Sequence, residues 1–378
     1  MTLIGMDAKR IVNNRTGLGN YGRTLVRDLV ESAQDFSFAL YAPTLGAEDL
    51  RNQLPEDDRC RLVTPGRTWP MVGKWWWRQR GLVDDLRRDG VALYHGLTGE
   101  LPFGLQKAGI KSVVTIHDLI FMRHPEYYHL WDVAIYEWKF RHACREADKI
   151  IAISECTKRD IMELGGVEES KIEVIYQSFA QRYHGSVKQE VVEKVRKKYA
   201  LPKRYILNVG SVEERKNVLL AVKALAYIPQ DVQLIIVGKA TPYAKKVREY
   251  ADSHGLGERV KILHGVSDEE LHAIYQEAEA FVYPSRYEGF GIPIIEAVGC
   301  GLPVVACTGS CLEEAGGPDC LYVHPDDVGA MAEALVASLR GALGREQCIA
   351  ASSRYIRRFL GTDTAAQVAD IYRNVLGK

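Results

Sequence analysis

The chain has 378 residues, more than one hydrophobic core usually organises, so two domains of about 150 to 200 residues are expected. Its 49 basic and 49 acidic side chains cancel, which excludes the global field that favours nucleic acid and leaves any anionic ligand to a local site. The eight cysteines include no CxxC pair, no apolar leader stands at the N-terminus, and no apolar window is long enough for a membrane span. A cytoplasmic protein is therefore predicted.

Short apolar runs alternate with amphipathic stretches, a pattern typical of parallel strands covered by helices on both faces. The first half predicts strands at residues 2–7, 36–42, 60–65, 91–96, 111–118, 149–154 and 172–176. A polar segment at 181–203 predicts a linker and the first helix of a second domain. The pattern then restarts, with strands at 204–210, 232–239, 260–265, 280–284 and 302–306. The sequence therefore predicts an α/β protein of two doubly wound, Rossmann-like domains, with ligand loops at the carboxyl ends of the strands.

A G-x-G-x-x-G pattern at Gly17, Gly19 and Gly22 follows the first strand and matches the dinucleotide-binding spelling. However, the pattern begins ten positions after Asp7, and no acidic residue ends the next strand. A flexible glycine loop, whose amides are available to a phosphate or an acceptor, is the other interpretation.

Two further features of the first half are candidates for function. Three adjacent tryptophans, Trp75 to Trp77, lie among basic side chains, where core packing is favoured over a membrane-interface patch. His117 and Asp118 come at the carboxyl end of a predicted strand. A lone histidine is often structural, but this position at a ligand-binding edge makes His117 a candidate site residue.

Arg215 and Lys216 follow the first strand of the second domain, in "NVGSVEERKN". Cations near a helix start oppose the helix dipole, so an exposed basic pair is disfavoured there. The pair is instead well placed to neutralise a diphosphate leaving group.

The stretch "YPSRYEGFGIPIIEAVGCGLPVVA" reads as a strand, a loop and a helix with Pro293 in its first turn. Glu288 lies in the loop, and Glu296 lies about one turn into the helix. Amides at 289–291 and the helix dipole suit a phosphate, while carboxylates suit the hydroxyls of a sugar. The alternative is a solvated loop residue followed by a surface acid.

Metal ligation is not expected. No D-x-D triad occurs in the chain, so cationic side chains and amides should stabilise a nucleotide diphosphate without a metal or another cofactor. The spacing of Cys300, Cys307, Cys311 and Cys320 matches no familiar zinc pattern, and small buried thiols are the favoured interpretation.

Together these motifs resemble the family 4 glycosyltransferases, which have the two-domain GT-B fold and retain anomeric configuration. The resemblance spans nearly the whole chain and is most specific at 265–306. It implies that Glu288 meets the donor sugar, that Glu296 meets the nucleotide ribose, and that His117 lies near the sugar. It also implies a diphosphate clamp and donor-binding loops made by Arg215, Lys216, Gly17, Gly19, Gly289, Phe290 and Gly291.

The resemblance also implies the domain roles. Residues 1–183 would bind the acceptor, together with a returning C-terminal helix at 358–378, and residues 184–357 would bind the nucleotide sugar across a central cleft. Three departures stand out: Ser211 replaces an arginine of many members, "IYQSFA" replaces "IPNGVD" at the interdomain crossing, and "FLGTDTAAQ" replaces "FSWE" near the last helix.

The implied function is that of a bacterial mannosyltransferase-like enzyme of lipopolysaccharide or exopolysaccharide biosynthesis. It would move a hexose, with GDP-mannose as the favoured donor, to a hydroxyl of a glycan or lipid-linked acceptor by metal-independent front-face displacement. Peripheral contact with the inner face of the membrane is expected, and nucleic acid is not a partner. The alternatives are an NAD-dependent oxidoreductase, a GT-B epimerase or phosphorylase-like enzyme, and a non-catalytic sugar-binding module.

Overall fold

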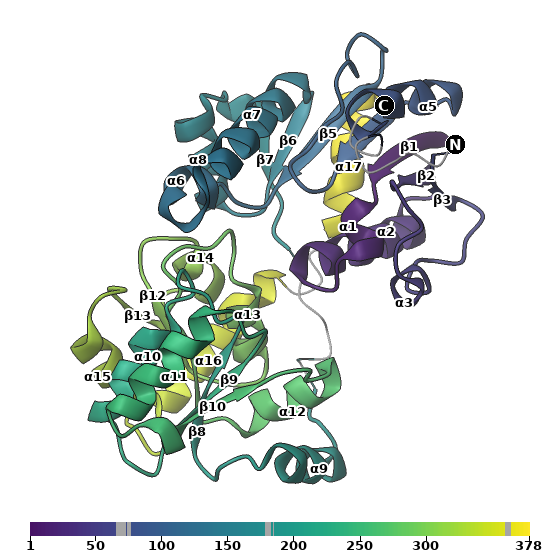
Figure 1. Cartoon of the computed structure of the whole chain (residues 1–378). Coiled ribbons are helices and arrows are strands. Elements are labelled where there is room, and N and C mark those ends of the chain that lie inside the picture. Colours follow the sequence, from purple (N-terminus) through teal and green to yellow (C-terminus); the bar gives the residue numbers. More distant parts are fainter. Residues whose placement is uncertain (66–72, 74–76, 178–182, 184, 360–363) are drawn as a thin grey trace. The chain divides into compact units, whose positions relative to one another are not determined.

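The structure is a computed structural model that describes residues 1–65, 73, 77–177, 183, 185–359 and 364–378. The chain forms two compact units (Figure 1). Unit 1 comprises Met1–Gln177 and Asp363–Lys378, and unit 2 comprises Ser178–Thr362.

The sheet described in unit 1 has strand order β3-β2-β1-β4-β5-β6-β7, and each neighbouring pair is parallel. The strands are β1 (Thr2–Asp7), β2 (Phe36–Tyr41), β3 (Cys60–Val63), β4 (Leu93–Gly96), β5 (Lys111–Ile116), β6 (Lys149–Ala152) and β7 (Ile172–Val174). The helices are α1 (Lys9–Asn13), α2 (Gly17–Ser32), α3 (Glu48–Arg51), α5 (Leu82–Arg88), α6 (Ile120–Arg123), α7 (Leu130–Glu146), α8 (Glu155–Gly165) and α17 (Thr364–Leu376).

Unit 1 has a hydrophobic core on each face of its sheet. Alternate side chains of a strand point to opposite faces, so Phe36 and Phe38 of β2 pack with α1, α2 and α17, whereas Ala39 and Tyr41 pack with α5 and α7. The buried positions of α17 recur at helical spacing, with Ala365, Val368, Ala369 and Tyr372 on one face. The C-terminal helix α17 therefore completes the core of unit 1.

The sheet described in unit 2 has strand order β10-β9-β8-β11-β12-β13, again with parallel neighbours. The strands are β8 (Tyr205–Val209), β9 (Gln233–Val237), β10 (Val260–Leu263), β11 (Ala280–Tyr283), β12 (Val304–Cys307) and β13 (Leu321–Val323). The helices are α9 (Gln189–Tyr199), α10 (Val218–Ala224), α11 (Tyr243–Ser253), α12 (Asp268–Glu277), α13 (Ile292–Gly299), α14 (Leu312–Gly316), α15 (Val328–Ser338) and α16 (Arg345–Tyr355).

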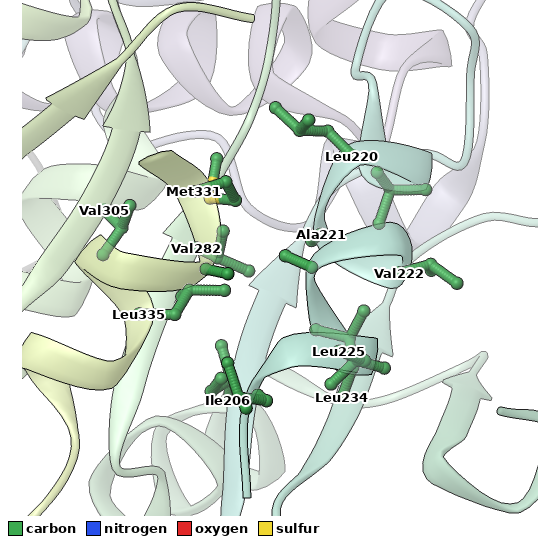
Figure 2. Close-up of a cluster of buried hydrophobic side chains, with 14 of the residues drawn as sticks. Ile206, Leu220, Ala221, Val222, Leu225, Leu234, Val282, Val305, Met331 and Leu335 are labelled. Atoms are coloured by element: carbon green, nitrogen blue, oxygen red, sulfur yellow. The ribbon is translucent and has the colours of Figure 1, made fainter. Parts of the chain in front are cut away.

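One core of unit 2 lies between its sheet and helices α10 and α15. Figure 2 shows Ile206, Leu234 and Val282 of the strands facing Leu225 of the segment after α10 and Leu335 of α15. All five side chains are buried, which ties the central strands of the sheet to two helices from distant parts of the sequence. This packing holds the carboxyl ends of β8 and β11 in fixed positions.

The fold prediction is confirmed. Each of the twelve predicted strands is present, although several end one or two residues earlier than expected. Strand β13 was not predicted, because three residues after a Gly- and Pro-containing run carry too little pattern to be recognised. Among the described helices, none combines the length and the apolar character that crossing a bilayer requires.

Candidate active site

The candidate site of unit 2 lies where the strand order reverses. Strands β8 and β11 are hydrogen-bonded neighbours, while the chain continues from β8 to β9 on one side and from β11 to β12 on the other. Ligands of open parallel sheets bind beside the carboxyl ends of the strands at such a point. Arg215 and Lys216 follow β8, and Glu288 follows β11, so the topology itself brings these predicted residues together.

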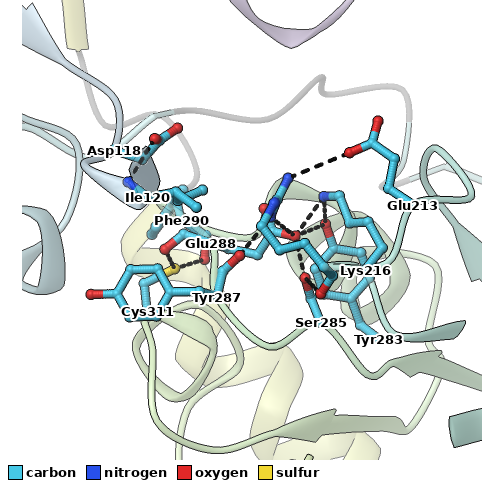
Figure 3. A network of polar contacts seen from close by, with 11 residues as sticks. Asp118, Ile120, Glu213, Lys216, Tyr283, Ser285, Tyr287, Glu288, Phe290 and Cys311 are labelled. Carbon is cyan, nitrogen blue, oxygen red and sulfur yellow. Dashed lines mark hydrogen bonds and ion pairs between the residues drawn. The ribbon is translucent and has the colours of Figure 1, made fainter. Parts of the chain in front are cut away.

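Four side chains converge on one carboxylate oxygen, Oε1 of Glu288 (Figure 3). The distances to Oε1 are 2.5 Å from Nζ of Lys216, 3.0 Å from Nη1 of Arg215, 2.5 Å from Oγ of Ser285 and 3.3 Å from the hydroxyl of Tyr283. We call these five residues the Glu288 cluster. Because the Glu288 side chain is only 11% exposed, it is not the solvated loop residue of the alternative interpretation.

The Glu288 cluster is charged at neutral pH. Burial alone would raise the pKa of Glu288, but the positive charges of Lys216 and then Arg215 outweigh burial and lower this pKa to about 2. Burial alone would lower the pKa of Lys216, and the carboxylate of Glu288 instead raises it above its usual value. Two cations thus face the carboxylate of Glu288, and Arg215 also lies 4.0 Å from the more exposed carboxylate of Glu213.

The loop that carries Glu288 is fixed by buried contacts. Sγ of Cys311 lies 3.1 Å from the carbonyl oxygen of Glu288 and 2.7 Å from that of Phe290, and its single S–H can donate to either of them. Gly291 precedes α13 with φ of +118°, and a side chain there would also approach Leu312. Cys311 therefore has a structural role. The described residues contain no group of three or more His, Cys, Asp or Glu side chains placed to hold a metal ion.

Glu296 lies on α13 and has a different partner. The hydroxyl of Tyr275, on α12, donates to Oε2 of Glu296 at 3.2 Å. The ring of Tyr275 packs edge-to-face against Tyr183, with ring centroids 5.6 Å apart. Glu296 is partly buried and its carboxylate accepts from Tyr275, so it is not a free surface acid.

His117 belongs to unit 1 and follows β5. Its Nε2 lies 2.8 Å from the carbonyl oxygen of Leu97, and its Nδ1 lies 3.1 Å from the side-chain nitrogen of Gln177. Burial lowers the pKa of His117 to about 4, so the imidazole is neutral at neutral pH. His117 is thus an uncharged histidine whose ring is fixed by two hydrogen bonds.

The glycine motif forms the start of a helix, which corrects the flexible-loop interpretation. Gly17, Gly19 and Gly22 lie in the first two turns of α2. A Cβ atom on Gly19 would lie 1.9 Å from the carbonyl oxygen of Asn14, and one on Gly22 would lie 2.7 Å from Cγ1 of Ile11. Close packing of α2 against the preceding segment therefore accounts for two of the three glycines.

Gly19→Ala is expected to destabilise the protein, because the added methyl group requires the backbone at Asn14 to move. Overpacking of this kind typically costs about 1–3 kcal/mol. Gly17→Ala is the matched control, since a Cβ there meets nothing within 4 Å. Thermal unfolding should show a lower Tm only for Gly19→Ala, and equal losses in both variants would contradict this packing role.

The tryptophan segment is described only in part. Trp77 is buried, and its Nε1–H donates to Oδ2 of Asp85 at 2.7 Å, as core packing predicts. Arg78 forms ion pairs of 3.1 Å with Asp7 and with Glu100. Trp75 and Trp76 lie outside the described residues.

Comparison with known families decides the class of the protein. The model described as "Glycosyltransferase Family 4" matches residues 15–178, and the model described as "Glycosyl transferases group 1" matches residues 191–354. The chain belongs to the family 4 glycosyltransferases. Both halves of this glycosyltransferase are thus matched, one model to each predicted domain.

Relatives and solved structures agree with this assignment. The glycosyltransferase is 26% identical to O-antigen chain mannosyltransferase B of Escherichia coli over 95% of this chain and 96% of the relative. It is 30% identical to O-antigen chain mannosyltransferase RfbU of Salmonella typhimurium over 57% of each chain. Sucrose-phosphate synthase from Thermosynechococcus elongatus superposes with a TM-score of 0.80 at 20% identity over 100% of both chains. WaaG, a glycosyltransferase involved in lipopolysaccharide biosynthesis, superposes with a TM-score of 0.73 at 16% identity over 98% and 99%. The GT-B fold is thereby shown.

Several residues that contact the candidate site residues could not be predicted from the sequence. Tyr283 and Ser285 belong to the same stretch as Glu288, at 283–306, but nothing in their spacing marks them as its partners. Tyr275 lies on a neighbouring helix, and Gln177 lies 60 residues from His117. Only the folded chain brings these side chains to their partners.

Proposed function

We propose that this glycosyltransferase moves a hexose from a nucleotide sugar to a hydroxyl of a glycan or lipid-linked saccharide, with mannose from GDP-mannose as the favoured donor. The Glu288 cluster carries the proposal, because it presents two cations and a carboxylate together at the switch point of unit 2. The names of the O-antigen mannosyltransferases support mannose as the sugar. The acceptor is assigned to the N-terminal domain and the donor to the C-terminal domain.

In the proposed reaction, Lys216 and Arg215 stabilise the charge that grows on the departing diphosphate. An ammonium group has three N–H donors, and the contacts of Lys216 with Glu288 and Tyr283 leave one for a ligand within the described part of the chain. Glu288 is proposed to accept a hydrogen bond from the transferred sugar, and Glu296 one from the ribose. Gly289, Phe290 and Gly291 would place backbone amides beside the phosphates, and His117 is assigned a contact with the sugar.

The chemical step is proposed to proceed on one face of the sugar. The bond between the anomeric carbon and the diphosphate oxygen breaks, and the bond to the acceptor oxygen forms on the same side. The acceptor proton passes to the departing diphosphate oxygen, so no side chain needs to act as a nucleophile. Retention of configuration follows from this geometry.

The first test is donor binding in the presence of EDTA. GDP-mannose at 100 times its Kd should stabilise the folded protein by about 2.7 kcal/mol and raise the Tm, because the ligand binds only the folded state. Other nucleotide sugars and NADH serve as comparisons in the same thermal-shift screen. Loss of both binding and turnover in EDTA, restored by magnesium or manganese, contradicts the metal-free site. Saturable NADH binding without nucleotide-sugar binding contradicts the glycosyl-transfer proposal.

We further propose that the protein works in the cytoplasm, in peripheral contact with the inner face of the membrane. Helix α7 supports this, because Leu130, Trp131 and Trp138 are exposed on it, and tryptophan favours the interface between water and lipid.

Trp131→Ser should reduce sedimentation of the protein with anionic lipid vesicles, since the Trp131 side chain is 83% exposed and contributes apolar area. Tyr227→Ser, an equally conspicuous exposed aromatic of unit 2, is the matched control. If the parent and both variants sediment equally, α7 is not the contact.

A further inference from the structure

Both ring nitrogens of His117 are engaged within unit 1. A carbonyl oxygen can only accept a hydrogen bond, so the contact with Leu97 requires that Nε2 of His117 carry the proton. Nδ1 is then an acceptor, and the side-chain amide of Gln177 donates to it at 3.1 Å. The imidazole therefore has no hydrogen-bonding atom left for a ligand while Gln177 stays in place.

The ring is also held in orientation. The ring of Tyr21 makes a T-shaped contact with it, with centroids 4.9 Å apart and an interplanar angle of 85°. The hydroxyl of Thr157 donates to the backbone carbonyl of His117 at 3.3 Å. A ligand that needs Nδ1 must consequently displace Gln177 rather than turn the ring.

Gln177 stands at a special place in the chain. It is three residues beyond the end of β7 and is the last residue of the first segment of unit 1. Gln177 is partly exposed, so its side-chain amide can leave Nδ1 for water. Gln177, which contacts Nδ1 of His117, is thus also the residue after which the chain continues into unit 2.

We infer that Gln177 is a positioning residue that occupies Nδ1 of His117 and yields it to a hydroxyl of the transferred sugar. The inference rests on the proposed function, in which His117 contacts that sugar. A hydroxyl can donate to Nδ1 as the amide does, so one hydrogen bond replaces another and the amide of Gln177 turns to water. When the sugar binds, the side chain of Gln177, where the chain leaves unit 1, therefore changes its hydrogen-bond partner.

Two substitutions of Gln177 should change donor affinity in opposite directions. Gln177→Leu removes the competing amide and should tighten binding of the nucleotide sugar by about three- to tenfold. Gln177→Glu keeps the shape, but a carboxylate can only accept, so both ring nitrogens must carry protons. This charge-assisted hydrogen bond is harder to displace, and affinity should fall by about tenfold. A purely structural role would not produce opposite signs.

Isothermal titration of GDP-mannose and of free GDP measures the effect. Free GDP lacks the hexose, so its affinity should be unchanged in Gln177→Leu. If the new carboxylate of Gln177→Glu repels the nucleotide in general, the affinity of free GDP for that variant falls as well. Gln34→Leu, which removes an exposed amide of unit 1, is the matched control. Nitrogen-15 shifts of the His117 ring should show one protonated nitrogen in the parent and two in Gln177→Glu.

Equal affinity of the parent and Gln177→Leu for the nucleotide sugar, or weaker binding by Gln177→Leu, overturns the inference. His117→Ala separates this failure from failure of the proposed function. If His117→Ala weakens binding of the nucleotide sugar while the Gln177 variants match the parent, only the role of Gln177 is lost. If His117→Ala leaves that affinity unchanged, the assignment of His117 to the sugar is itself wrong.

Discussion

Lys216→Met should lower the turnover number of glycosyl transfer by about 100- to 1,000-fold, which corresponds to about 2.7–4 kcal/mol in the barrier. The ammonium lies in the buried Glu288 cluster, where a charge acts more strongly on a departing diphosphate than it would in water. Steady-state kinetics with saturating donor measure the effect. Lys245→Met, which removes an exposed lysine of the same unit, should leave turnover near that of the parent.

Measuring the stability of Lys216→Met distinguishes an effect on catalysis from an effect on folding. Removing Lys216 leaves the buried carboxylate of Glu288 with Arg215 as its remaining cationic partner, and the lost charged hydrogen bond should cost about 1.5–3 kcal/mol in the free energy of unfolding. The double variant Lys216→Met with Glu288→Gln removes the unbalanced charge and should regain most of that stability in urea unfolding. Turnover should stay low. Near-normal turnover in folded Lys216→Met would remove this lysine from the proposed clamp.

Glu288→Ala and Glu296→Ala should be distinguished by which ligand they affect. Loss of Glu296 should weaken both GDP and the nucleotide sugar by at least about tenfold, because each contains the ribose and a hydrogen bond to a carboxylate is worth about 1.5–3 kcal/mol. Loss of Glu288 removes the counter-charge of Lys216 and Arg215, so GDP should bind at least as tightly as to the parent. Transfer of the sugar should nevertheless slow.

Calorimetry with both ligands and a transfer assay test this separation. Glu288→Gln and Glu296→Gln serve as controls, since they remove the charge and keep the shape. Should both alanine variants bind GDP and the nucleotide sugar as the parent does and transfer at the parent's rate, neither glutamate has the proposed role.

The fold was predictable because all the described strands except β13 carry their own signal. Runs such as Phe36–Tyr41 and Gln233–Val237 are apolar on both faces, as buried parallel strands must be. Strand β13 carries no such signal in three residues. The glycine motif could not be assigned from sequence, because the same pattern occurs in phosphate-binding loops and in helices that pack closely on a neighbouring segment. Only the position of Asn14 in the structure distinguishes the two.

The site was predictable as a set of residue types, not as a geometry. Lys216 and Glu288 stand 72 residues apart, and their ion pair follows from the adjacency of β8 and β11, which the sequence does not state. The contact of Gln177 with His117 was hidden for the same reason. A single sequence identifies groups that can do chemistry, whereas strand order decides which of them meet.

The return of α17 to unit 1 sets the order in which the protein can mature on the ribosome. Residues that pack on Phe36 and Phe38 are the last to be translated, and Tyr372 closes a 2.6 Å hydrogen bond with the buried His95. All of Ser178–Thr362 must be synthesised first, which takes about 10 to 40 s at typical bacterial and eukaryotic rates. During that interval the apolar face that α17 later covers is exposed on the nascent chain. Unit 2 can therefore fold before unit 1 is complete. A premature stop codon ahead of α17 would leave unit 1 without part of its hydrophobic core.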